Sequence, residues 1–270
     1  MRIKNLLLTA CVVLAMVGTA FAGSIEVKGS TTVFPIMQKW VEAFQGAHSG
    51  AAISVSGGGS SNGIKALLDG TTDIAMASRK MKDKEVTLAK EKGVEPKEFV
   101  VALDAVLPIV NPSNPVTNLT IDQLRGIYAG DITNWKEVGG KDETIVVISR
   151  DTSSGTYETW EHFVMGKKAR VTPRALLQAS SGAVLTAVGK NPKAISYDGI
   201  GYVNKTVKAL KVNGVEGTAQ TAKDKSYPIS RELQIYTNGA PKGEVKTFID
   251  FMLSPAGQKF VGEAGFVPLD

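Results

Sequence analysis

Cysteine and histidine are almost missing from this chain of 270 residues. It has one cysteine, Cys11, and two histidines, His48 and His162. A single cysteine excludes a disulfide framework and a thiolate metal site. The two histidines lie far apart in the sequence, with no pattern of carboxylates or cysteines around them. We therefore predict no metal site and no cofactor.

Two further absences restrict the class of protein. Beyond the N-terminal segment, no stretch approaches the roughly 18 consecutive apolar residues that a membrane-spanning helix needs. No long tract of lysine and arginine occurs either, although the net charge is +5, so we do not expect binding to nucleic acid. A mild excess of positive charge is consistent with an anionic ligand.

The first 22 residues have the pattern of a secretory signal peptide. Arg2 and Lys4 give a charged start, an apolar run extends from Leu6 to Val17, and Ala20-Phe21-Ala22 is a typical cleavage site. We predict export, cleavage after Ala22 and release of a soluble protein into the periplasm. Removal of Arg2 and Lys4 lowers the net charge from +5 to +3. The remaining chain is long enough for one large domain or two of average size.

An alternative reading of this segment remains open. Leu8-Thr9-Ala10-Cys11 resembles a lipoprotein cleavage box, in which Cys11 would carry a lipid anchor. Only three leucines precede this cysteine, and the apolar stretch continues well past it, so the ordinary signal peptide is favoured.

Three segments place small hydroxyl residues and glycine where helices are predicted to begin. They are Gly29 to Thr32, Gly57 to Gly63 and Arg150 to Thr156. The N-terminus of a helix offers unpaired N–H groups and the positive end of the helix dipole, which together make an anion site. One such segment would be ordinary, because Ser and Thr are common N-caps. Three indicate convergence on a single small oxyanion.

Strands and helices alternate along the chain, which predicts an α/β fold with largely parallel sheets. We expect strands at 24–28, 52–56, 72–77, 144–149, 194–197, 201–203 and 233–237, and helices at 33–46, 62–69, 82–92, 120–128, 157–165, 244–253 and 255–264. Residues 174–188 are expected to form one or two helices. The apolar run from Phe99 to Val110 is too long for one ordinary strand and too interrupted by Pro108 for a helix.

These motifs, in this order, resemble the solute-binding proteins of bacterial phosphate ABC transporters, which are type II periplasmic binding proteins. The matching segments are residues 29–35, 57–63, 73–79, 109–112, 154–156, 227–231 and 248–258. Each motif is weak alone, but the ordered set is specific and covers essentially the whole chain after residue 22.

The resemblance implies two α/β lobes that are joined by two crossing strands and close on the ligand. Lobe 1 would comprise residues 23–104 and about 232–270, and lobe 2 about 105–231. The Phe99 to Val110 run would carry the chain between the lobes, and the return would fall near Tyr227 to Thr237. The closing helices would then pack on lobe 1.

The resemblance also implies the ligand-binding residues. Thr31, Thr32 and Ser60 would donate hydrogen bonds from lobe 1, and Arg150, Ser154, Gly155 and Thr156 would do so from lobe 2. The chain departs from the best-known branch of the family at one position. That branch has an aspartate, which takes a proton from phosphate and so rejects sulfate, where this chain has Ser78 followed by Arg79. The nearest replacement is Asp104.

Three charged residues are weighed on their positions in the sequence. Arg150 ends a buried strand, where α/β proteins bind ligands; the alternative is a surface arginine paired with Asp151. Arg79 also ends an apolar strand and is a candidate for the site. Because lysines follow it, a solvent-exposed basic edge is an alternative that is nearly as well supported. Asp104 lies inside an apolar run and needs a partner, for which Arg79 or Arg150 is the obvious kind.

We therefore predict a monomeric periplasmic protein that captures inorganic phosphate and delivers it to an ABC transporter permease in the inner membrane. Another tetrahedral oxyanion, such as sulfate or molybdate, is an alternative, and a surface interaction or sensor protein on the same scaffold remains open. An exported phosphatase is disfavoured, because Ser154 lacks a Gly-x-Ser-x-Gly context and no metal cluster is visible. We expect no enzymatic activity.

Overall fold

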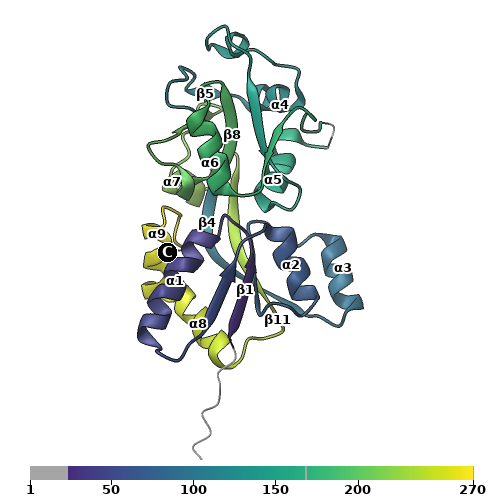
Figure 1. The fold of residues 1–270 in the computed structure, drawn as a ribbon, viewed down its shortest axis with the longest axis vertical. Coiled ribbons are helices and arrows are strands. Elements are labelled where there is room, and N and C mark those ends of the chain that lie inside the picture. The colour runs from purple at the N-terminus through teal and green to yellow at the C-terminus, as the bar shows by residue number, and fades with distance from the viewer. Residues whose placement is uncertain (1–23, 168, 270) are drawn as a thin grey trace, which may run out of the picture.

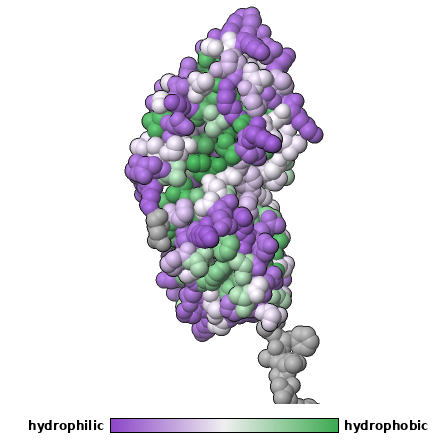
Figure 2. Space-filling model, turned by 90° about the vertical axis from the view of Figure 1, so that its left-hand side faces the viewer, coloured by the Kyte–Doolittle hydropathy of each residue, from purple (hydrophilic) through white to green (hydrophobic). Residues whose placement is uncertain are grey.

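The computed structural model describes residues 24–167 and 169–269, so the predicted signal peptide and its cleavage site lie outside the described residues. The chain folds into two halves stacked along the long axis, which we call the lower and upper halves from their positions in Figure 1. Seen from the side, the halves meet at a waist, and hydrophilic side chains gather at the far end of the upper half (Figure 2). Within the described residues, no helix is both long and apolar enough to cross a membrane.

The lower half contains both the beginning and the end of the described chain. Its elements are β1 (Ile25–Gly29), α1 (Phe34–Ala47), β2 (Ile53–Ser56), α2 (Ser60–Leu68), β3 (Ile74–Ala77), α3 (Asp83–Glu91), α8 (Gly243–Leu253) and α9 (Pro255–Glu263). Helix α1 buries one apolar face because Ile36, Met37, Trp40 and Phe44 recur at helical spacing. The indole N–H of Trp40 donates to the carbonyl of Gly257 over 2.8 Å, which fixes α9 against α1.

The upper half consists of the middle of the chain. Its elements are β5 (Asn118–Leu119), α4 (Ile121–Ala129), β6 (Val146–Arg150), α5 (Gly155–Trp160), β7 (Leu176–Gln178), α6 (Ser181–Lys190), β8 (Ala194–Gly199), β9 (Lys208–Ala209), β10 (Lys211–Val212) and α7 (Ala219–Lys223). Strands β7, β6 and β8 are parallel neighbours. The register pairs Val147 with Ile195, so Arg150 and Asp198 both lie at the carboxyl edge of this sheet.

Two strands cross between the halves (Figure 1). Strand β4 (Pro96–Val110) pairs antiparallel with β11 (Ser230–Asn238) as far as Ala105 and with β8 from Val106 onward. The sheets are therefore continuous, in the order β2-β1-β3-β11-β4-β8-β6-β7. The α/β fold with two crossings is confirmed, and the apolar run from Phe99 to Val110 is part of one long strand.

Each half has its own hydrophobic core. The lower core surrounds Trp40, Phe44 and Phe248, whereas the upper core surrounds Trp160 and Tyr197. The last two rings stack with centroids 4.3 Å apart. Separate cores allow each half to keep its shape when the other moves.

Two secondary-structure predictions are wrong. The expected strand at 201–203 is a 3₁₀ turn, Ile200–Tyr202, in which Gly201 lies against the ring of Phe266 so closely that a Cβ would come within 2.2 Å of it. The expected helical stretch 174–188 begins instead with β7, which adds to the edge of β6, before Ser180 caps α6. The predicted helix 157–165 is the α-helix α5 as far as Trp160 and continues as a π-helical turn, Glu161–Met165. The other predicted helices and strands are present, with their ends shifted by a few residues.

Candidate functional site

The three hydroxyl- and glycine-rich segments meet at the junction of the halves. Ser61 N–H donates to the carbonyl of Ser153 over 3.0 Å, and Ser153 Oγ donates to the carbonyl of Gly58 over 3.1 Å. A Cβ on Gly59, whose φ is +98°, would come within 2.5 Å of the Ser153 carbonyl. Only glycine permits this approach, and it brings the α2 and α5 segments into contact.

Seven of the predicted residues lie at this junction, where each makes a contact across it or is next in the chain to a residue that does. An eighth, Arg150, reaches them from β6. We call the set the Arg150 cluster: Thr31, Thr32, Ser60, Ser78, Arg150, Ser154, Gly155 and Thr156.

Thr32 and Thr156 join the first and third segments. Their hydroxyl oxygens lie 2.9 Å apart, and both side chains are buried. Thr32 is held in place because its backbone N–H donates to Ser30 Oγ over 3.2 Å, at the start of α1. Both hydroxyls can donate or accept, so the pair can reorient toward an oxyanion.

Ser60, Ser78 and Gly155 form a second group of contacts. Ser60 Oγ accepts from the backbone N–H of Ser78 over 3.0 Å, and the two serine hydroxyls lie 3.3 Å apart. A Cβ on Gly155 would come within 2.4 Å of Ser60 Oγ and 2.6 Å of Ser78 Oγ. The backbone at the start of α5 therefore presses directly on two buried hydroxyls, and Ser154 caps the same helix by accepting from Tyr157 N–H.

Arg150 supplies the positive charge of the cluster. Its side chain is buried although arginine is usually exposed, and each of its three nitrogens donates to oxygen. Nε donates to the Gln178 carbonyl, Nη1 to Ser181 Oγ, and Nη2 to Thr31 Oγ1, at 3.1 to 3.2 Å. Since these partners are neutral oxygens, the guanidinium charge is available to an anion.

Asp198 is a neighbour of this arginine that the sequence analysis missed. It is fully buried, and its Oδ1 accepts from Ser181 Oγ over 2.9 Å and from Gly199 N–H over 2.8 Å. Its Oδ2 has no hydrogen-bond partner among the described residues. Burial raises the pKa of Asp198 to about 6, although the charge of Arg150 acts in the opposite direction. Its position at the carboxyl end of a parallel strand, like that of Arg150, could have revealed it.

Arg231 is the second missed residue, and it corrects the expected partner of Asp104. The partner is neither Arg79 nor Arg150: Arg231 Nε donates to Asp104 Oδ2 over 2.8 Å, and Nη2 lies 2.7 Å from the same oxygen. Strands β4 and β11 place the two residues opposite each other. Arg231 Nη1 then reaches Thr156 Oγ1 over 3.1 Å. Asp104 thus contacts the cluster through Arg231, and its Oδ1 is occupied by Ile200 N–H.

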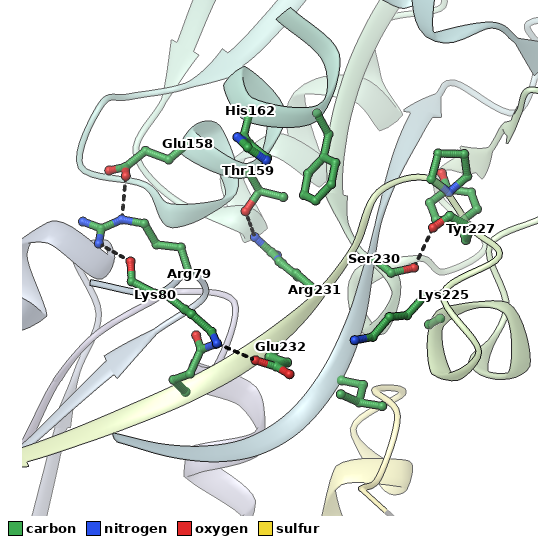
Figure 3. Close-up of a pocket in the computed structure, with 15 residues that line it drawn as sticks. Arg79, Lys80, Glu158, Thr159, His162, Lys225, Tyr227, Ser230, Arg231 and Glu232 are labelled. Atoms are coloured by element: carbon green, nitrogen blue, oxygen red, sulfur yellow. Dashed lines mark hydrogen bonds and ion pairs between the residues drawn. The ribbon is translucent and has the colours of Figure 1, made fainter. Parts of the chain in front are cut away.

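The structure does not bring Arg79 to the Arg150 cluster. Its guanidinium makes two 2.8 Å contacts with Glu85 and places Nε 2.6 Å from Glu158. Arg79 instead lines a cavity of about 690 Å³ that lies between the halves beside β11, with Glu158, Thr159 and Arg231 in the same wall (Figure 3).

The arrangement is suited to binding rather than to reaction. Hydroxyls, backbone N–H groups and a buried guanidinium can surround a tetrahedral anion with donors from several directions. Within the described residues, no group of three or more His, Cys, Asp or Glu is placed to hold a metal ion.

The chain is similar to proteins of known family. The family model of the PBP superfamily domain matches residues 17–256. A phosphate-binding protein PstS from Borreliella burgdorferi is 34% identical over 254 residues, which cover 90% of this chain and 89% of that protein. A PstS from Staphylococcus aureus is 37% identical over 259 residues, or 91% of this chain and 78% of that protein.

Solved structures give the same relationship. A substrate-binding protein from Clostridium perfringens, crystallised with bound phosphate, superposes with a TM-score of 0.86 at 37% identity, covering 92% of this chain and all of that one. An ABC-type phosphate transport receptor from Vibrio cholerae has a TM-score of 0.74 at 37% identity, covering 90% of this chain and 99% of the other.

Proposed function

Since this chain belongs to the PBP superfamily, and within it to the phosphate-binding proteins of ABC transporters, we propose that it holds inorganic phosphate in the Arg150 cluster. The observation that carries this proposal is a buried guanidinium that donates to hydroxyls of both halves, Thr31 and Ser181, beside the Thr32–Thr156 contact, and that has no carboxylate partner among the described residues. Desolvated phosphate is stabilised by such fixed dipoles and by the arginine charge.

Binding then needs no covalent chemistry. The cluster contains no nucleophile with an adjacent base, because its hydroxyls contact one another or arginine rather than a histidine. We therefore propose a binding protein and not an enzyme, which acts outside the cytoplasm as a monomer and delivers its ligand to the permease of an ABC transporter.

Closure of the two halves completes the site. The donors come from elements on both sides of β4 and β11, so these strands are the proposed hinge, and the moving lobes are residues 23–104 with about 232–270, and about 105–231. Opening would separate Thr32 from Thr156 and Gly59 from Ser153, and phosphate could then leave.

Selectivity for phosphate over sulfate requires an acceptor for the proton that phosphate carries near neutral pH. The oxygens of Asp104 are engaged by Arg231 and by Ile200 N–H. Asp198 has an oxygen without a partner among the described residues and is linked to Arg150 through Ser181. These contacts favour Asp198 over Asp104 as the acceptor.

Isothermal titration of the desalted protein tests the proposal. Phosphate and arsenate should bind with a stoichiometry of one, sulfate should bind far more weakly, and a phosphate ester should not be hydrolysed. Tight binding of sulfate would contradict the assigned ligand, and turnover of the ester would contradict the absence of catalysis.

A further inference from the structure

Glu158 is held by three side chains of the opposite half. It lies on α5 in the upper half, and its Oε2 is 2.6 Å from Arg79 Nε and 2.8 Å from Lys82 Nζ. Its Oε1 accepts from Ser61 Oγ over 3.1 Å. Figure 3 shows Glu158 approaching Arg79 from the helix above, across the junction. We call Arg79, Lys82 and Glu158, with Ser61, the interlobe clasp.

The clasp is built from restrained groups rather than from mobile surface charges. The side chains of Arg79 and Glu158 are 8% and 11% exposed. Arg79 is fixed from its own half by Glu85, whose carboxylate contacts both terminal nitrogens of the guanidinium. Burial tends to raise the pKa of Glu85, but the contacts with Arg79 oppose it and the pKa is lowered overall. Two carboxylates thus face two cations, and ion pairs in such a partly buried place are screened less than exposed ones.

The position of the clasp connects it to the phosphate site. Ser61 directly follows Ser60 of the Arg150 cluster, and Glu158 lies within one helical turn of Gly155. The backbone N–H of Glu158 donates to the carbonyl of Ser154 over 3.2 Å within α5, whereas its carboxylate contacts Arg79, Lys82 and Ser61 and does not need to touch phosphate. Its partners in the lower half are available only when the halves are together, because opening separates α5 from α2 and from the segment after β3.

We propose that Glu158 is a positioning residue that stabilises the closed form and thereby slows the release of phosphate. The inference rests on the proposed function. A contact that exists only in the closed form shifts the opening equilibrium, and ligand affinity changes by the same factor when the free protein is mainly open. Encounter of phosphate with the open form does not use the clasp, so the effect falls on dissociation.

The test compares Glu158→Gln with Glu161→Gln. Glu161 lies one turn further along the same helical segment, and among the described residues its carboxylate accepts from the hydroxyl of Tyr157, within its own half. By stopped-flow release of phosphate, Glu158→Gln should raise the dissociation rate about tenfold to a hundredfold with little change in the association rate. Glu161→Gln should leave both rates within about twofold of the wild type.

A double-mutant cycle separates the clasp from a general loss of stability. Lys82→Met should raise the dissociation rate on its own, and its effect should largely disappear in the Glu158→Gln background. An unchanged dissociation rate in Glu158→Gln, or an equal increase in Glu161→Gln, would overturn the clasp. Additive effects of Lys82→Met and Glu158→Gln on the dissociation rate would overturn it as well. Failure of the wild-type chain to bind phosphate would instead overturn the proposed function.

Discussion

Thr32 and Thr156 share a hydrogen bond of 2.9 Å between their hydroxyl oxygens, although 124 residues separate them in the chain. Thr156 Oγ1 also accepts from Arg231 Nη1 over 3.1 Å. One hydroxyl therefore links the start of α1 in the lower half, α5 in the upper half and the crossing strand β11. The proposed anion-binding loop at the start of α5 is thus in contact with one strand of the proposed hinge.

Replacement of Thr156 by valine should weaken phosphate binding by about tenfold or more. The substitution keeps the shape of the side chain but leaves the Thr32 hydroxyl and an Arg231 donor without this partner. Thr156→Ser keeps the hydroxyl and is the matched control. Calorimetry should show near-normal affinity for the serine variant, and equal affinities for the two variants would remove the hydroxyl from the mechanism.

Gly155→Ala should hold the halves apart. The new methyl group would lie 2.4 Å from Ser60 Oγ and 2.6 Å from Ser78 Oγ, so the closed arrangement would be strained. Gly182→Ala on α6 meets nothing within 4 Å and serves as the control. With saturating phosphate, small-angle scattering should give a larger radius for Gly155→Ala than for the control, together with weaker binding. A radius of gyration identical to that of the wild type would show that the segment at the start of α5 can shift to accommodate the methyl group.

Arg150→Ala should weaken phosphate binding by about a hundredfold or more, because a buried charge-assisted contact to the anion is lost. Arg170→Ala removes an exposed arginine of the same half and should have little effect on affinity. Circular dichroism should confirm that both variants are folded. A loss below tenfold in folded Arg150→Ala would place the anion elsewhere.

The free energy of unfolding should depend on pH through Asp198. Its pKa is about 6 in the folded protein against an ordinary value of 3.8, so the native state binds more protons than the unfolded state between these pH values. The contribution of this group to the free energy of unfolding therefore falls by about 3 kcal/mol in total as the pH rises from about 4 to 6. Urea titrations at several pH values should show that Asp198→Asn has lost this slope; an unchanged slope would assign it to another group.

The same carboxylate should distinguish phosphate from sulfate. Asp198→Asn should weaken phosphate binding and reduce the preference for phosphate over sulfate, because an amide can donate to either anion. Asp104→Asn should instead lower the free energy of unfolding by about 3–5 kcal/mol, since it leaves the buried Arg231 without its ion-pair partner. Competition binding with both anions checks this assignment, and relaxed selectivity in Asp104→Asn alone would reverse it.

Local sequence signals predicted the three segments and Arg150, whereas the family resemblance supplied the individual residues of the Arg150 cluster. Each of the three segments ends a strand and begins a helix, and the first two follow the parallel neighbours β1 and β2, whose carboxyl ends lie at one edge of the sheet. The third follows β6 in the upper half, so its approach to the other two depends on how the halves are joined. The cap of α5 by Ser154 and the buried end of β6 at Arg150 are properties of a few neighbouring residues. Such features can be predicted without knowing where residues distant in the sequence lie.

Pairings between distant strands could not be predicted in the same way. Arg231 and Asp104 are 127 residues apart, and only the antiparallel register of β4 with β11 brings them together. The sequence position of Arg79 also suited an anion site, but its guanidinium pairs with Glu85, which is close in the sequence, and with Glu158 of the upper half. Gly201 lies in a 3₁₀ turn and packs against the ring of Phe266, a contact with a residue far along the chain that local sequence does not reveal.

The place of β11 in the sheet sets the order in which the protein can be completed during synthesis. This strand lies between β3 and β4, yet it follows the whole upper half in the chain. The upper half can therefore fold while β3 still has an unpaired edge and α1 lacks its partners α8 and α9. That edge belongs to a strand that is fully buried in the finished protein, and an exposed apolar edge invites pairing with another chain. The nascent lower half is consequently the part that most needs protection until the last residues emerge.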